Sequence, residues 1–439
     1  MVVKKGFVIL LLLLAVVVLI SPGIVGRFAE QSMDENLEFA ATEANEVTIT
    51  SQGFDRGWFS SAGQHRLELR DGELYDTLLL MAGDDIGALP ALIIDTHIDH
   101  GLVPVTSMTR AQGSLAPGLG SAVSTLTLEL ADRSTIALPG TIYSEVGLSG
   151  ALTSNLVLEP GSFADGDETA HWGAVDIEVT TSPSTRVIGF RGDIEELLLV
   201  SPTNEISVGT ISFAGERQQT RFGVSVGDAS FAIDSITMPS EWGTDTLGPV
   251  AIVSSASASG ELLSGQTSIR LDDLPFGELG RANIHIAASF ADFDGQALGN
   301  IARALDEYDS RSSGNEFFVG LEDDVQRLLA AGLQLRFSQF DIIMQPGTVS
   351  ATLDVDLEAS DINNFAWASA LQALDARLDF SVPAELYDYA VSIDPQVSTA
   401  VGMGYLRRSG DAYQMQAVFQ DGLLTINGAP TPIPLPGGN

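Results

Sequence analysis

Strict alternation of apolar and polar residues is the feature that most constrains the fold of this chain. It is clearest over residues 348–357, where every second residue is Val, Ala or Leu and the others are Thr, Ser or Asp. Successive side chains of a β-strand point to opposite faces, so this pattern buries one face and leaves the other in water. One wet face per strand is typical of antiparallel sheets. Further strands with the same alternation are predicted over 125–130, 175–179, 221–226 and 230–236.

Helical spacing of apolar residues appears mainly in the second half of the chain. Helices are predicted over 296–309, 322–333, 365–374 and 383–391, and a strand over 376–382. Near the end, Asp421-Gly422 and Asn427-Gly428 predict two tight turns between strands. No linker divides the chain, and 311–315 is the expected flexible loop. The predicted fold is mainly β with minor α: a long antiparallel sheet with an alternating apolar face, late packing helices and an N-terminal transmembrane helix.

The N-terminal segment predicts where the chain resides. No residue from Gly6 to Gly26 is charged, and Lys4 and Lys5 precede this segment. An apolar stretch of about 20 residues can span a bilayer, and flanking lysines stay on the cytoplasmic side. We therefore expect a single-pass protein of the bacterial inner membrane with its bulk in the periplasm. A cleaved signal peptide has the same charged start and apolar middle, and this alternative stays open.

These expectations divide the chain into five parts. Residues 1–5 are the cytoplasmic N-terminus and residues 6–26 the transmembrane anchor. Residues 27–45 are rich in Glu, Ala, Met and Leu and predict a helical stalk. Residues 46–428 form an extracytoplasmic β-rich domain, and residues 429–439 a Pro/Gly tail.

The charge of the chain excludes one class of partner. The formal net charge is −37, from 58 acidic and 21 basic residues. Such a surface repels nucleic-acid phosphates, and it also disfavours binding of the folded domain to anionic lipid head groups. Cysteine is absent, so thiolate chemistry and Cys-based metal sites are excluded. No cofactor is indicated.

Known catalytic motifs are missing from the sequence. There is no HExxH helix, no P-loop lysine, no nucleophile elbow and no GxGxxG opening a βαβ unit. One segment could bind a metal: in a strand, Asp95, His97 and Asp99 share one face and His100 lies on the other. Because carboxylates are abundant and no second His cluster exists, a strand that ends in a turn is the simpler interpretation.

Four short segments resemble the YdgA-like family of bacterial envelope proteins, whose activity is unassigned. They are 53–61, with Arg56-Gly57-Trp58-Phe59; 98–104, with His100-Gly101; the region from 271 to the helix at 296; and 419–428, ending in Asn427-Gly428. In this chain two residues separate Gly101 from Pro104, which departs from the family's His-Gly-Pro pattern. The resemblance implies an inner-membrane anchor and a periplasmic β-rich body. It implies no catalytic residues.

The sequence therefore favours a membrane-anchored envelope protein without catalytic activity that binds a lipid or a protein partner. A long sheet with one apolar face must cover that face by closing on itself, curling into a groove or packing on helices. Two alternatives stay open. One is a metal-dependent hydrolase that uses Asp95, His97, Asp99 and His100. The other is a structural module that self-associates into a homo-oligomer.

Overall fold

The computed structural model describes most of the chain after residue 46. The described residues are 47–56, 60–70, 75, 89–100, 118–130, 133–147, 149–165, 168–182, 184–202, 205–240, 243–306, 320–362 and 365–431. They divide into two compact units: the first comprises residues up to 218 together with 231–245, and the second comprises 219–230 and the residues from 246 onward. The predicted anchor, stalk and flexible loop (6–26, 27–45 and 311–315) lie outside the described residues.

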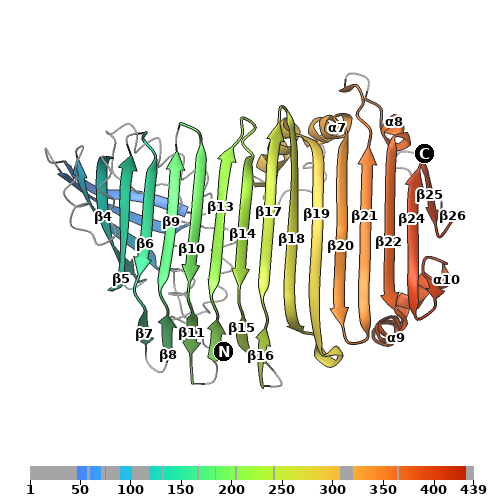
Figure 1. Ribbon diagram of the computed structural model, residues 1–439, viewed down its shortest axis with the longest axis horizontal. Coiled ribbons are helices and arrows are strands. Elements are labelled where there is room, and N and C mark those ends of the chain that lie inside the picture. The colour runs from blue at the N-terminus through green and yellow to red at the C-terminus, as the bar shows by residue number, and fades with distance from the viewer. Residues whose placement is uncertain are drawn as a thin grey trace. The chain divides into compact units, whose positions relative to one another are not determined.

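The first unit is built from an antiparallel meander in which each strand pairs with the next one in the order given (Figure 1). The strands are β1 (Val47–Arg56), β2 (Ser60–Leu69), β3 (Ala91–His100), β4 (Gly118–Glu129), β5 (Thr135–Gly147), β6 (Leu152–Leu158), β9 (Val175–Ser182), β10 (Val187–Ile194) and β13 (Ile211–Gln219). A smaller antiparallel sheet joins β7 (Gly161–Asp165), β8 (Glu168–Trp172), β11 (Leu197–Val200), β12 (Glu205–Val208) and β15 (Ile236–Ser240). The strands β14 (Ser225–Ile233) and β16 (Gly243–Leu247) cross the boundary between the units.

The core of the first unit is formed by alternate residues of both its sheets. Leu92, Ile94, Ile142, Leu156 and Ile177 are each at most 1% exposed and belong to one hydrophobic cluster. Trp172 also lies in this cluster, and its indole N–H donates to the Glu159 carbonyl at 3.1 Å. The first unit therefore covers its apolar faces with its own strands.

Two-residue breaks interrupt the long strands where the two sheets of the first unit meet. At one break, the Gly209 N–H donates to Ser235 O at 2.8 Å and the Asp234 N–H donates to Thr210 O at 2.9 Å, so pairing continues through it. A Cβ atom on Gly209 would lie 2.9 Å from Ser235 Oγ, which explains glycine there. The predicted strand 230–236 is therefore wrong in its extent, because it ends at Ile233 and a new strand starts at Ile236.

The second unit continues as a meander with the same antiparallel pairing. Its strands are β17 (Val250–Ser259), β18 (Leu262–Pro275), β19 (Arg281–Asp294), β20 (Leu333–Met344), β21 (Gly347–Leu357), β22 (Leu374–Pro383), β24 (Ala412–Gln420), β25 (Leu423–Ile426) and β26 (Ala429–Thr431). The short β23 (Arg407–Ser409) pairs with β24. The turns at Asp421-Gly422 and Asn427-Gly428 are confirmed, since all four residues have the positive φ angles of tight hairpins.

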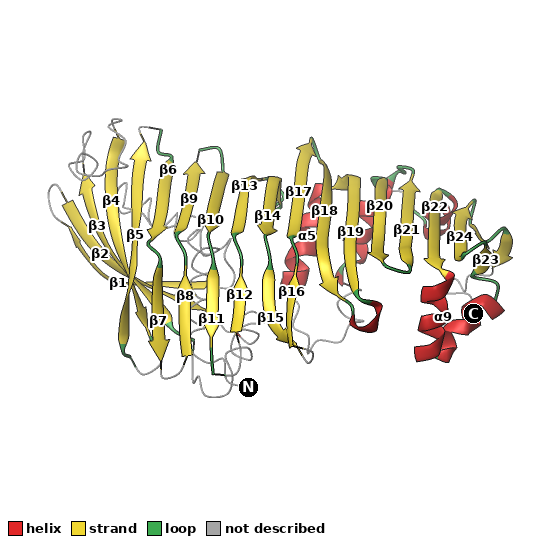
Figure 2. Cartoon of the chain, turned by 60° about the horizontal axis from the view of Figure 1, so that its bottom comes forward, coloured by secondary structure: helices red, strands yellow, loops and turns green. Residues whose placement is uncertain are grey.

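Helices of the second unit connect its strands. They are α5 (Gly295–Asp306), α7 (Glu322–Ala330), α8 (Trp367–Gln372), α9 (Ala384–Ile393) and α10 (Thr399–Gly402), with 3-10 turns η1 (Gly277–Leu279) and η3 (Pro395–Ser398). In Figure 2, α5 lies behind the strands and α9 projects from the β22–β24 end. Each of the four predicted helices contains an observed helix. Their ends differ, because 331–333 leaves the helix for β20 and because Pro383 ends β22 before α9 begins.

The predicted class, mainly β with a few helices and antiparallel pairing, is confirmed. Two further predictions were wrong in detail. The segment 221–226 is a turn up to Gly223, and β14 starts at Ser225. The first three residues of the predicted tail form β26, which pairs with β25.

Candidate functional site

The apolar face of the second unit is only partly buried along its middle in the part of the chain that the structure describes. Two cross-strand rows on this face run from β18 to β24, and none of their residues is buried. Phe337, in the second row, is 36% exposed. The first row is Ile269, Ile286, Phe340, Ala351, Phe380 and Met415, and the second is Thr267, Ala288, Phe337, Leu353, Leu378 and Ala417. We call these twelve residues the apolar strip.

The strip is bounded by residues on the same sheet face that are covered. At the end nearest α5 and α7, Leu263 is 2% exposed and Leu357 is 5% exposed. At the opposite end, the Tyr387 ring of α9 lies 4.1 Å from the Tyr413 ring of β24, centroid to centroid, and Tyr387 is itself buried. Helices therefore cover both ends of the face and leave the strip between them partly open.

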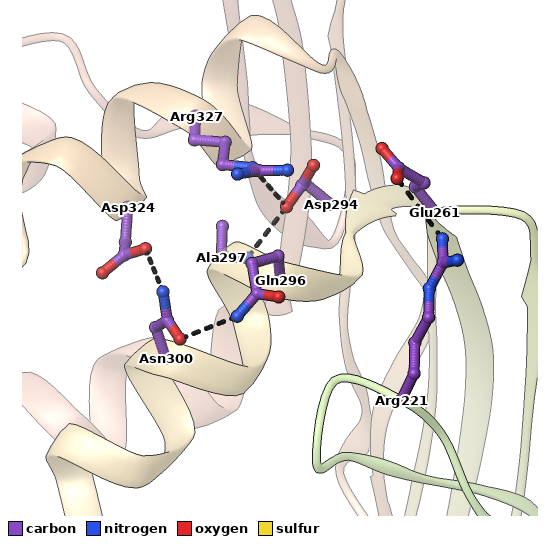
Figure 3. Close-up of polar contacts among 8 residues, drawn as sticks. All are labelled: Arg221, Glu261, Asp294, Gln296, Ala297, Asn300, Asp324 and Arg327. Carbon is purple, nitrogen blue, oxygen red and sulfur yellow. Dashed lines mark hydrogen bonds and ion pairs between the residues drawn. The ribbon is translucent and has the colours of Figure 1, made fainter.

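A polar network positions the helix pair α5 and α7 (Figure 3). Asp294, at the end of β19, is 7% exposed, and its Oδ1 accepts from the Ala297 N–H at 2.8 Å and from Arg327 Nε at 2.9 Å. The first bond caps the N-terminus of α5, and the second bond ties α7 to the same carboxylate. Asn300 of α5 donates to Asp324 of α7 at 2.8 Å, a second link between the helices.

The chemistry that the strip offers is purely van der Waals and hydrophobic. Its only hydroxyl belongs to Thr267, and it contains no charged side chain. At a strand spacing of about 4.8 Å, its six strands span roughly 24 Å from β18 to β24. Such a surface favours contact with aliphatic groups, and it supplies no group for proton transfer or metal binding.

The opposite face of the same strands is polar and hollowed. A hollow of about 590 Å³ lies over β21, β22, β23 and β24. Within it, Asp379 accepts from Gln416 Nε2 at 2.9 Å and from Arg377 Nε at 2.7 Å. The hydrogen bond from the Arg377 guanidinium, followed by that from Gln416, lowers the pKa of the Asp379 carboxyl. The carboxylate is thus already satisfied by its neighbours.

Asn427, one of the predicted motif residues, lies at the edge of this hollow. Its Oδ1 accepts from the Gln416 N–H at 3.0 Å, and its Nδ2 donates to Gly404 O at 2.9 Å and to Tyr405 O at 3.0 Å. Its φ angle of 51° and that of 77° at Gly428 build the tight turn. The Asn427-Gly428 motif therefore holds the last hairpin against the loop after α10.

The other motif residues are only partly described. Arg56 ends β1 and His100 ends β3, but their side chains lie outside the described part of the structure. Gly57, Trp58, Phe59 and Gly101 lie outside the described residues altogether.

The candidate metal segment forms most of β3. Asp95 and His97 are exposed and share a face with Asp99, as predicted. His97 Nε2 lies 3.4 Å from Asp99 Oδ1, and Gln64 Nε2 donates to Asp95 Oδ1 at 2.7 Å. Among the residues whose side chains are described, no three His, Asp or Glu side chains lie close enough to hold a metal ion.

Sequence reasoning missed the buried imidazole of His65. His65 of β2 is 5% exposed, and its Nδ1 has no hydrogen-bond partner among the residues that the structure describes. Desolvation lowers the pKa of this imidazole, which favours the neutral ring. The only local signal is its place in the alternating segment 63–67, where His65 takes an inward position before Leu67.

None of the helices in the described part of the chain is both long and apolar enough to cross a bilayer. The predicted span over 6–26 is not among those helices, because it lies outside the described residues.

Comparisons with known proteins place the chain in a family. A family model described as "Bacterial protein of unknown function (DUF945)" matches residues 3–434. Protein YdgA of Escherichia coli (strain K12) is 22% identical over 215 residues, which cover 47% of this chain and 41% of that protein. The match thus spans less than half the length of that curated relative, and no solved structure matches the chain. Because the family model covers nearly the whole chain, the protein belongs to the bacterial DUF945 family, which confirms the resemblance to the YdgA-like proteins.

Proposed function

We propose that this protein is a membrane-anchored envelope protein that binds an aliphatic lipid chain along the apolar strip of its second unit, without catalysing a reaction. One observation carries this proposal: the central apolar residues of the second unit are not buried, whereas the first unit buries its own. The anchor predicted over residues 6–26, with its preceding lysines, supports a place at the inner membrane with the bulk in the periplasm.

The free energy of hydration favours an occupant on the strip. Burial of apolar surface contributes about 25 cal/mol per Å², or about 0.8 kcal/mol for each buried methylene. Soluble monomers rarely leave large continuous apolar patches exposed. At a strand spacing of about 4.8 Å, the strip extends roughly 24 Å across its six strands. This length allows many methylenes of one acyl chain to contact it.

The lack of polar groups favours a lipid over a peptide. A peptide laid on the strip would desolvate its backbone N–H and C=O groups, and strip side chains other than Thr267 offer no partners for them. An acyl chain has no such groups. Its polar head group would lie outside the strip, in contact with water.

Photo-crosslinking of the full chain tests this proposal. The probe is a diazirine-bearing palmitate, added to the protein in mild detergent, and the readout is the crosslinked peptides identified by mass spectrometry. Leu353 lies in the strip and Thr352 beside it faces the polar side, so L353N and T352N form a matched pair on β21. We expect crosslinks on β20, β21 and β22 that fall several-fold in L353N and persist in T352N.

Two results would reject the acyl-chain proposal. One is crosslinking that does not fall in L353N although the variant keeps the far-ultraviolet spectrum of the parent chain. The other is crosslinking that maps mainly to the first unit. Size measurement of the detergent-extracted protein distinguishes self-association through the strip, because a dimer would bury these residues and exclude the probe.

A further inference from the structure

The polar hollow of the second unit is lined by two cross-strand rows of hydrogen-bonding side chains. Directly paired residues of antiparallel strands place their side chains on the same face, so the register defines these rows. At a strand spacing of about 4.8 Å, the first row extends roughly 14 Å across β21, β22, β24 and β23. The first row is Ser350, Ser381, Gln414 and Arg407, and the second is Thr352, Asp379 and Gln416.

Side chains inside the hollow are less exposed than those farther along the same strands. Asp354 of β21 and Arg377 of β22 belong to the same polar face and are exposed. The residues of these two strands that line the hollow are partly buried, and they are Ser350, Thr352, Asp379 and Ser381. Arg407, Ser409 and Asn427 complete the lining on the β23 side. The polar side chains therefore form a concave site on the sheet.

The first row has hydrogen-bonding capacity that the protein does not use. The hydroxyls of Ser350 and Ser381 and the amide of Gln414 form no hydrogen bond with any residue that the structure describes. Arg407 Nη1 donates to Asn427 O at 2.9 Å, and its other N–H groups have no partner within the described part of the chain. Hydroxyl and amide side chains both donate and accept, whereas a guanidinium only donates. The row thus presents donors and acceptors side by side.

We propose that the hollow binds a neutral saccharide through the hydroxyl groups of its rings. Each sugar hydroxyl is both a donor and an acceptor, which matches the serine hydroxyls and the Gln414 amide. The volume of about 590 Å³ lies within the range of about 300–1,000 Å³ that is typical of small-ligand sites. Asp379 and Arg407 both line the hollow, so a ligand of either charge meets a like charge. This site lies on the face opposite the apolar strip.

Saturation-transfer difference nuclear magnetic resonance on the full chain tests this proposal. The chain is kept in lauryldimethylamine oxide, a detergent without a sugar head group. The probes are cellobiose and di-N-acetylchitobiose as neutral saccharides, glucuronate as an anion, glucosamine as a cation and trialanine as a peptide. Gln414 and Gln420 are both exposed on the polar face of β24, but only Gln414 lines the hollow. Q414A and Q420A therefore form a matched pair.

We expect at least one of the two neutral disaccharides to bind, and to bind more tightly than glucuronate, glucosamine or trialanine. Q414A should raise its Kd about fivefold, the equivalent of about 1 kcal/mol for one hydrogen bond, and Q420A should leave the Kd unchanged. The proposal is overturned if neither disaccharide binds, or if any of the other three probes binds more tightly. A Kd that Q414A does not change, or that both variants raise equally, would also overturn it. The palmitate crosslinks are measured separately, so either proposal can fail alone.

Discussion

Replacement of Asp294 by alanine should loosen the helix pair that bounds the apolar strip. The carboxylate caps α5 through the Ala297 N–H and pairs with Arg327 of α7. Loss of an N-cap acceptor costs about 1 kcal/mol. Loss of a hydrogen bond to a charged partner costs about 1.5–3 kcal/mol, but the Arg327 side chain is 45% exposed and regains water, so about 1 kcal/mol is expected here. D294A should therefore destabilise α5 by about 2 kcal/mol.

The variant D294N separates the two contributions. Asparagine caps a helix about as well as aspartate, so D294N keeps the cap and loses only the charge. Its cost should be about 1 kcal/mol. As a control, E261Q removes an ion pair with Arg221 whose side chains are 64% and 66% exposed, and its effect should be negligible.

Native-state hydrogen exchange read by mass spectrometry measures these effects locally. It suits a chain with two compact units, for which a single unfolding transition is not assured. Amides of α5 should exchange about 30-fold faster in D294A and about fivefold faster in D294N, since 1.4 kcal/mol corresponds to a factor of ten. The reasoning is refuted if D294A leaves the α5 amides within twofold of the parent chain, or if E261Q accelerates them equally.

Three further predictions concern other sites. Because burial lowers the pKa of His65, the unfolded state binds a proton more readily, so the first unit should lose stability as the pH falls below about 6.5. H65L should flatten the dependence of the urea midpoint between pH 7.5 and 5.5. R377Q should raise the pKa of Asp379, read from its carboxyl carbon by nuclear magnetic resonance, and it should leave the urea midpoint unchanged because the pair is solvent-exposed. N427A should destabilise the last hairpin by about 2–3 kcal/mol, through lost side-chain hydrogen bonds and a positive φ angle; an unchanged exchange rate for β24 and β25 amides would contradict this.

The apolar strip shows what the alternation of apolar and polar residues can predict about a strand and what it cannot. Alternation correctly predicted that Leu353 and Phe380 share a face with their neighbours, because side-chain direction within a strand depends only on local geometry. It predicted equally well the alternation of Ile177 in the first unit. The face that contains Ile177 is nevertheless buried, whereas the face that contains Leu353 and Phe380 is not. The exposure of each face depends on segments distant in sequence, which no local pattern encodes.

The candidate sites were also predictable from the sequence only in part. The Asn427-Gly428 turn was predictable from the dipeptide, yet the partners of the Asn427 side chain come from residues 404, 405 and 416. The exposure of Ile393 and Met403 was not predicted, because both look like ordinary core residues in the sequence.

The sequence alone determined the antiparallel β class, the positions of several strands and of four helices, the two final turns and the family. These properties depend on side-chain alternation, on turn residues with positive φ angles and on short motifs, all of which act over a few residues. Only the tertiary structure decided the strand breaks, the division into two units and the partly open strip. Each of these arises where residues far apart in the chain meet, or fail to meet, in space.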